Sequence, residues 1–213
     1  MYSKIGRQTE SAPSVGSGEK HGSVDAFDAA ATKWNFHRYQ PGLVGGHCIP
    51  VDPYYLTYAS SKLGYDARVV LAGREVNEQV AEFAADKVAE LLRLSGNDQA
   101  NVSVLLLGLT FKPNVSDLRN SKALTLAGLL LERNLTLDVY DPIAGDRFPE
   151  DIGCRLVEDP FISNKTYDAV VLVVPHDIFM VQKTCIVELA NPGGLVVDLV
   201  SFNEFDILCF HNS

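Results

Sequence analysis

The sequence has no apolar run that approaches the roughly 20 residues of a membrane-spanning helix. Its first residues also lack the apolar core of a signal peptide. Positive charge is scarce, because 18 lysines and arginines stand against 27 aspartates and glutamates, for a formal net charge of -9. This balance argues against binding to a nucleic-acid backbone, which needs clustered positive charge. We therefore expect a cytoplasmic protein in which local groups meet any anionic ligand.

Cysteine is also scarce, and its spacing excludes the common zinc motifs. The four cysteines are Cys48, Cys154, Cys185 and Cys209. They form no CxxC pair, so no metal site is predicted. Scattered cysteines in a chain of 213 residues are typical of reduced thiols and not of a disulfide framework. The hydrophobic fraction of 46% and the charged fraction of 21% predict a globular protein with one core of ordinary size and an appendage.

Composition divides the chain into four stretches. Residues 1–23 are rich in serine, glycine and charge without an apolar period, and they are predicted to be disordered. Residues 24–95 contain an extended loop and two predicted helices. Residues 96–200 alternate apolar runs of strand length with striped helical segments. The tail, 201–213, carries no pattern to which we assign a role.

Two helices are predicted in the second stretch. The first spans 53–63 and ends at Gly64. In the second, apolar residues recur at three- and four-residue steps from Val76 to Leu92, and Gly96 ends it. A helix of about 25 residues is long for a small domain. Two interpretations stay open: a stripe that faces the core throughout, or one that partly forms a subunit or interdomain interface.

The third stretch has the pattern of a parallel sheet. The segments 102–107, 135–140, 167–174 and 194–200 are predicted to be strands, and the uninterrupted Val/Leu runs within them indicate burial on both faces. Helical segments are predicted between them, at 122–133, 178–182 and 186–190. This order predicts an α/β fold, with a Rossmann-like parallel sheet covered by helices and preceded by a helical segment with a long connecting helix.

The stretch with the most chemical content is the glycine-rich loop 41–56, PGLVGGHCIPVDPYYL. Its glycines allow positive φ and a close approach to a ligand. Asp52 and Pro53 read as an N-cap followed by proline at the first helical position. Cys48 would then lie beside a helix N-terminus, which favours a thiolate. The residues alone leave two interpretations open, a covalent nucleophile or a turn with a buried cysteine. A dyad with His47 is not expected, because adjacent side chains usually point apart.

Two charged residues follow the first predicted strand. That strand ends at Gly108 without a GxGxxG fingerprint, so a dinucleotide pyrophosphate cradled in the usual way is not predicted. Lys112, together with the N-terminus of the next helix, could meet a diphosphate, or it is an ordinary solvated lysine. Arg119 could bind a carboxylate or phosphate, or pair with Asp117 on the surface.

Two further polar residues end predicted strands. Asp141 occupies the position of a ribose-binding acid at the end of the second strand, and it fits an ordinary turn equally well. His176 follows Pro175 at the end of the third strand, where we expect it to cap or turn the chain and not to perform chemistry.

The loop at 41–56 closely resembles the active-site cysteine loop of nucleotide-sugar 6-dehydrogenases, the UDP-glucose/GDP-mannose dehydrogenase family. It looks most like the branch that oxidises UDP-N-acetylhexosamines. The segments 31–36 (ATKWNF), 110–112 (TFK) and 117–121 (DLRNS) match the same family in the same order. The resemblance runs from about Val24 to about Asp198. It implies that 24–95 ends a central helical dimerisation domain and that 96–200 is a UDP-sugar-binding domain.

The resemblance also implies an activity. Family members oxidise the C6 hydroxymethyl group of a nucleotide sugar to a carboxylate by two hydride transfers to NAD, which supplies precursors of surface polysaccharides. A cysteine holds the intermediate aldehyde as a thiohemiacetal and then as a thioester. By resemblance, Cys48 is this nucleophile, Asp52 acts on the hydrolytic water, and Arg119 reaches NAD on another domain. The residues implied to bind the UDP-sugar are Tyr39, Gly42, Leu43, Val44, Gly45, Phe111 and Lys112.

The resemblance is partial. The family's glycine-rich NAD loop, and the threonine, glutamate, lysine and asparagine of its first domain and middle helices, have no counterpart here. We therefore interpret the chain as the C-terminal part of such an enzyme, inactive alone and dimeric through the long helix when full-length. The alternative is a non-catalytic nucleotide-sugar-binding or subunit-association module. A cysteine hydrolase ranks far below both, because the sequence places no base for Cys48.

Overall fold

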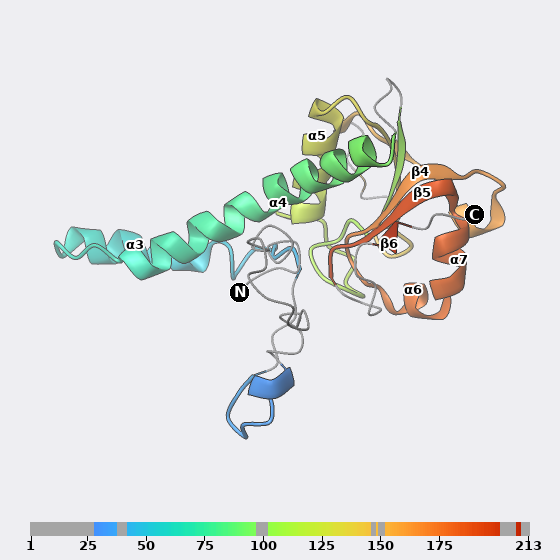
Figure 1. Cartoon of the computed structure of the whole chain (residues 1–213). Helices are drawn as coiled ribbons and strands as arrows, with labels where there is room; N and C mark the ends of the chain where they lie inside the picture. Colours follow the sequence, from blue (N-terminus) through green and yellow to red (C-terminus); the bar gives the residue numbers. More distant parts are fainter. Residues whose placement is uncertain are drawn as a thin grey trace, which may run out of the picture.

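The computed structural model describes residues 28–37, 42–96, 102–145, 148, 152–200 and 208–209. The predicted segment 1–23 lies outside these ranges. The described chain contains an α/β domain and a helical hairpin that projects from it. One long helix forms the second arm of the hairpin and continues onto the sheet (Figure 1).

The α/β domain is built on a six-stranded sheet of order β3-β2-β1-β4-β5-β6. Its strands are β1 (Ser103–Leu107), β2 (Thr136–Tyr140), β3 (Arg155–Leu156), β4 (Tyr167–Leu172), β5 (Ala190–Asp198) and β6 (Leu208–Cys209). The first five are parallel, and β6 pairs antiparallel with β5. The parallel sheet predicted from the apolar runs is confirmed. The sequence patterns missed β3 and β6, which are only two residues long.

Helices cover both faces of the sheet, as Figure 1 shows. The second half of α4 (Arg68–Leu94) and α5 (Lys122–Glu132) lie on one face, and α6 (Asp177–Val181) and α7 (Lys183–Glu188) lie on the other. Successive residues of β1 enter opposite cores, because side chains alternate along a strand. Leu106 packs in the core under α4 and α5, whereas Leu105 packs with Phe179 of α6. Burial on both faces explains the uninterrupted apolar runs.

One helix boundary in this domain was wrong. The segment 186–190 was expected to be helical to its end, but α7 stops at Glu188, and β5 begins at Ala190. Ala190 already pairs with Tyr167 at the start of β4. The strand therefore begins four residues before its apolar run. Its first part contains Pro192 and two glycines, and its buried part follows them.

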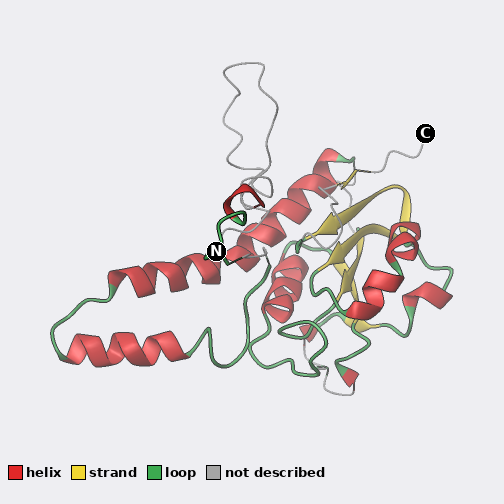
Figure 2. Cartoon of the chain, turned by 90° about the horizontal axis from the view of Figure 1, so that it is seen from below, coloured by secondary structure: helices red, strands yellow, loops and turns green. Residues whose placement is uncertain are grey.

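The helical hairpin, α3 (Asp52–Lys62) and the first half of α4, extends away from the sheet (Figure 2). Helix α3 has no buried residue. In α4, nearly all buried residues lie from Ala81 onward, while Val69, Leu71 and Val76 are exposed. The apolar stripe therefore faces the core only in its second half. None of the helices in the described ranges is both long and apolar enough to cross a membrane.

Candidate functional site

The cysteine loop is clamped onto the loop that follows β1. The N–H of Gly46 donates to the carbonyl of Asn120 at 3.1 Å. A Cβ on Gly45 would lie 2.5 Å from that carbonyl oxygen, and one on Gly46 would lie 2.8 Å from the Phe111 ring. From the other side, the Asn77 amide of α4 donates to the carbonyl of Val44 at 3.1 Å. The docking brings the cysteine loop into contact with the loop after β1, which carries Phe111 and Lys112.

The loop glycines were expected to let the backbone approach a ligand. In the structure, Gly45 and Gly46 instead let two segments of the same chain approach each other. Of the loop glycines only Gly46 has a positive φ, of 100°. Leu43 packs on the edge of the core, and a Cβ on Gly42 would meet only Val200 at ordinary contact distance. Tyr39 lies outside the described residues, so its placement stays a prediction.

Cys48 is exposed, so the interpretation of the loop as a turn around a buried cysteine was wrong. Its Sγ lies 3.3 Å from Nδ1 of His47. The expectation that these side chains point apart was therefore also wrong. The alternation of neighbouring side chains holds for extended backbone. Here the chain bends at residues 46–48, and the Cys48 carbonyl accepts from the N–H groups of Val51 and Asp52 at 3.0 and 2.8 Å.

Asp52 does not act as the helix N-cap that the sequence predicted. Val51 occupies that position, and Asp52 is the first residue of α3, with an exposed side chain. The reason is the turn that closes on the Cys48 carbonyl, which starts the helical backbone one residue early. Asp52 lies one turn after Cys48, and its role stays a prediction.

Arg119 and Asp117 form the surface pair that the sequence left open. The Arg119 guanidinium donates from Nε and Nη2 to the Asp117 carboxylate at 2.6 to 3.1 Å, and the Arg119 N–H also donates to it at 2.9 Å. These hydrogen bonds hold the pKa of Asp117 well below its ordinary value. The Arg119 side chain remains 71% exposed. Asp117 also lies 3.8 Å from Nε2 of His47.

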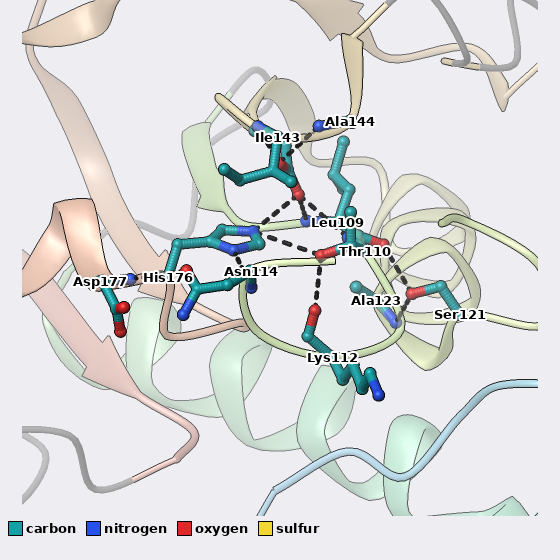
Figure 3. A network of polar contacts seen from close by, with 11 residues as sticks. Leu109, Thr110, Lys112, Asn114, Ser121, Ala123, Ile143, Ala144, His176 and Asp177 are labelled. Atoms are coloured by element: carbon teal, nitrogen blue, oxygen red, sulfur yellow. Dashed lines mark hydrogen bonds and ion pairs between the residues drawn. The ribbon is translucent and has the colours of Figure 1, made fainter. Parts of the chain in front are cut away.

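Lys112 is exposed, with its ammonium 5.4 Å from the centre of the Phe111 ring. Its backbone belongs to a buried polar network that holds the loop in place (Figure 3). The hub of this network is Asp141. Its carboxylate accepts from four backbone N–H groups at 2.6 to 3.0 Å, those of Leu109, Thr110, Ile143 and Ala144.

The carboxylate of Asp141 cannot take the ribose-binding role that the sequence left open. Its side chain has no exposed area, and its oxygens are filled by the four backbone donors and by His176 Nε2 at 3.1 Å. Burial raises the pKa of Asp141, but the hydrogen bonds from His176 and the backbone outweigh it and lower this pKa to about 2. Asp141 is thus an ionised, buried anchor for the loop after β1.

His176 fixes the far end of the same loop. It lies at the N-cap position of α6 and its carbonyl accepts from the N–H of Phe179 at 2.9 Å, so it turns the chain as expected, but its side chain makes no capping bond. Instead its Nδ1 accepts from the N–H of Asn114 at 2.9 Å. Nε2 must therefore carry the ring proton, which faces Asp141 and the Thr110 hydroxyl. The Thr110 hydroxyl in turn donates to the Lys112 carbonyl at 3.1 Å.

Sequence reasoning missed this network, although its signal was present. Thr110, Asp141 and His176 each stand just beyond an apolar strand. The carboxyl ends of neighbouring parallel strands meet at one edge of the sheet. Since β1 lies between β2 and β4, the three residues had to converge.

The turn after β1 does not fit the pyrophosphate of NAD. The N–H groups of Leu109 and Thr110, which would face such a ligand, are bound by Asp141. Gly108 has a φ of 88°, and a Cβ there would lie 2.5 Å from the Val174 carbonyl, so this glycine closes the turn against the sheet.

A cavity of about 500 Å³ lies apart from this site, beside β3. Arg155 and Lys165 line it, but both are bound to the buried carboxylate of Asp138. Burial raises the pKa of Asp138, while hydrogen bonds from Arg155, Lys165 and Tyr167 lower it to about 2. The carboxylate of Asp138 thus already neutralises part of the charge of the two cations, which makes the cavity a poor anion site. No cluster of three metal-ligating side chains occurs in the described part of the chain.

The fold and the docked loops together define a Rossmann-like α/β domain with an exposed cysteine in the loop docked at its edge. Residues 23–79 match the central domain of the UDP-glucose/GDP-mannose dehydrogenase family, and residues 105–203 match its UDP-binding domain. The chain belongs to this family.

Curated relatives and solved structures agree with this assignment. The chain is 40% identical over 152 residues to the UDP-N-acetyl-D-glucosamine 6-dehydrogenase of Pseudomonas aeruginosa, which covers 71% of the chain and 36% of that protein. It is 38% identical over 185 residues to protein CapL of Staphylococcus aureus, covering 86% and 43%. The UDP-D-ManNAc dehydrogenase structure of Pyrococcus horikoshii superposes with a TM-score of 0.71 at 25% identity, covering 88% and 42%. The chain thus spans less than half of each protein.

Proposed function

We propose that this chain supplies the nucleotide-sugar site and the nucleophile of an NAD-dependent UDP-sugar 6-dehydrogenase that acts on a UDP-N-acetylhexosamine. The observation that carries the proposal is the docking of the cysteine loop on the loop after β1, through Gly45, Gly46 and Asn120. The proposal is supported by the shared neighbour of the two loops: His47, next to exposed Cys48, and exposed Lys112 both lie near the Phe111 ring. The names of the relatives favour an N-acetylhexosamine as the sugar.

In this proposal each residue has a distinct task. Lys112 and Phe111 take the uridine diphosphate, and the segment 42–45 lies along the sugar. The Cys48 thiolate adds to the C6 aldehyde and keeps it from escaping as a thiohemiacetal, which becomes a thioester on oxidation. Asp52, one turn later, orients the water that releases the acid. NAD is the hydride acceptor of such a reaction, and Arg119 is the residue of this chain that we propose to contact it.

A non-catalytic nucleotide-sugar-binding or association module is the second candidate. Two observations favour it: the N–H groups after β1 are bound by Asp141, and the helical hairpin exposes apolar side chains. The most exposed of these are Tyr55, Leu63, Tyr65 and Val69. Uncovered apolar patches usually mark interaction surfaces. We propose that a second copy of the chain covers this one, whichever function holds.

The nucleotide preference of the chain provides the first test. We expect calorimetry to show UDP binding more tightly than NAD. Lys112→Ala should weaken UDP binding by about tenfold or more, because a hydrogen bond to a charged group contributes about 1.5 to 3 kcal/mol. Lys62→Ala, which removes another exposed lysine, on α3, should leave the affinity unchanged. NAD binding tighter than UDP would contradict the proposal.

Catalysis is tested by adding the NAD-binding domain of a relative in trans. With a UDP-N-acetylhexosamine, the complemented wild-type chain should produce two NADH per sugar. Cys48→Ser should bind the nucleotide sugar normally but yield one NADH per sugar, because the aldehyde is no longer held for the second oxidation. If Cys48→Ser formed sugar acid at the wild-type rate, Cys48 would not be the nucleophile. UDP-sugar binding without any NADH from the wild-type chain would favour the binding module.

A further inference from the structure

We infer that His47 is the proton acceptor that converts Cys48 to a thiolate, and that Asp117 is the positioning residue that orients its imidazole. The inference deepens the proposed function, on which it rests only for the role of Cys48 as nucleophile. The contacts themselves join two segments of the chain, the cysteine loop and the loop after β1.

The geometry orders the three side chains in a row. Cys48 Sγ lies 3.3 Å from His47 Nδ1, and His47 Nε2 lies 3.8 Å from the Asp117 carboxylate. If Nδ1 accepts the thiol proton, the neutral ring must carry its own proton on Nε2, where it faces Asp117. In the transfer the S–H bond breaks and an N–H bond forms at Nδ1. The thiolate stays on Cys48, and the new imidazolium charge lies beside a carboxylate.

Asp117 is ionised at the pH at which Cys48 is proposed to react, because its pKa is lowered. The hydrogen bonds from the Arg119 guanidinium and the Arg119 N–H are the main reason that the pKa of Asp117 is lowered, and His47 contributes a smaller electrostatic share. The side chain of Asp117 is only 15% exposed, whereas that of His47 is 47% exposed. Arg119 fixes the carboxylate in one orientation, so the carboxylate can orient the ring.

Two cations of the described chain lie on the loop that His47 contacts. Arg119 reaches it only through Asp117, and the Lys112 ammonium lies over Phe111, whose ring centre is 5.8 Å from that of His47. Both cations favour a thiolate nearby and oppose a charged imidazole. The carboxylate of Asp117 offsets this opposition, which is why it belongs to the arrangement.

The helix N-terminus is a weaker explanation for a thiolate at this position. The N–H groups of Val51 and Asp52 donate to the carbonyl of Cys48 and not to its sulfur. Asp52 also adds a negative charge in the first turn of α3, which opposes a second anion there. A base that touches the sulfur directly does not have this conflict.

The arrangement has a consequence for assembly. His47 meets Asp117 only because Gly45 and Gly46 lie flat against the loop after β1. Activation of the cysteine is therefore coupled to docking of the two loops, so that the thiol becomes reactive where the nucleotide site is complete.

The inference is tested on the chain itself, by the pH dependence of alkylation. Iodoacetamide labelling, resolved by residue with mass spectrometry, should show Cys48 reacting faster at pH 7 than the exposed Cys185. His47→Gln should lower the Cys48 rate at pH 7 by about tenfold and leave the high-pH plateau unchanged, because only the thiolate fraction falls. Asp117→Asn should lower it about threefold in the same pH range.

Two controls make each outcome decisive. Asp66→Asn removes a carboxylate that pairs with Arg68 at the tip of the hairpin, and it should leave the Cys48 profile unchanged. Circular dichroism checks that the variants fold. If His47→Gln does not fold, the Cys48 profile of Asp117→Asn tests the inference. A Cys48 profile that superimposes on the wild type, or one lowered equally at every pH, would overturn the inference. Failure of the complemented enzyme with this profile intact would instead count against the proposed function.

Discussion

Replacing Asp141 by asparagine is expected to lower the free energy of unfolding by about 3 kcal/mol, because the change breaks a buried ionic network. The asparagine amide group is a donor, and it would face backbone N–H groups or the Nε2–H of His176, which are donors too. At least one buried donor is then left without an acceptor. Urea denaturation followed by circular dichroism measures the loss. Asp86→Asn, which weakens an exposed pair with Arg133 on α4, should cost less than about 1 kcal/mol.

The same residue predicts how the protein responds to acid. The folded-state pKa of Asp141 is lowered to about 2 from an ordinary value of 3.8. A lowered pKa means that the ionised carboxylate stabilises the folded state above about pH 4, and this contribution is lost as the pH falls toward 2. The difference corresponds to on the order of 2 kcal/mol. Asp141→Asn should therefore show a flatter stability curve between pH 4 and 2. A slope equal to that of the wild type would show that Asp141 is not the group responsible.

The sequence predicted the sheet well because its signal is local. The residues of β1 after Ser103 alternate between two cores and are all apolar, so the run is recognisable without knowledge of any partner strand. The same holds for α4, where the three- and four-residue steps predicted the helix. The steps could not tell where the stripe is covered, because that depends on how far α4 extends beyond the sheet.

The candidate site was predicted only in part because its contacts join distant segments. Cys48 and Lys112 could be chosen from their own surroundings and from the resemblance. The contact of His47 with Asp117 joins residues that are 70 positions apart, and no local pattern marks it. The sequence left Asp141 open between two roles, because a strand-end aspartate looks the same whether its carboxylate faces a ligand or four backbone N–H groups.

Gly45 was read from the sequence as a residue that gives the loop freedom, but the structure makes it a contact point. An added Cβ would lie 2.5 Å from the Asn120 carbonyl oxygen and 3.0 Å from the Lys122 N–H nitrogen. Both are backbone atoms, and they cannot shift easily. Ser121 between them caps α5 and donates to the Leu109 carbonyl at 2.6 Å. The cysteine loop would have to lift away instead.

Gly45→Ala is therefore expected to destabilise the chain by about 2 to 3 kcal/mol, within the range for an added methyl group without room. Gly128→Ala is the matched control, because a Cβ there meets nothing within 4 Å inside α5 and should stabilise the helix by about 0.5 to 1 kcal/mol. The displaced loop should also separate His47 from Asp117 while His47 stays beside Cys48, so Cys48 in Gly45→Ala should alkylate at pH 7 about as slowly as in Asp117→Asn. A Gly45→Ala protein as stable as the wild type, with Cys48 equally reactive, would mean that the two loops are not docked in solution.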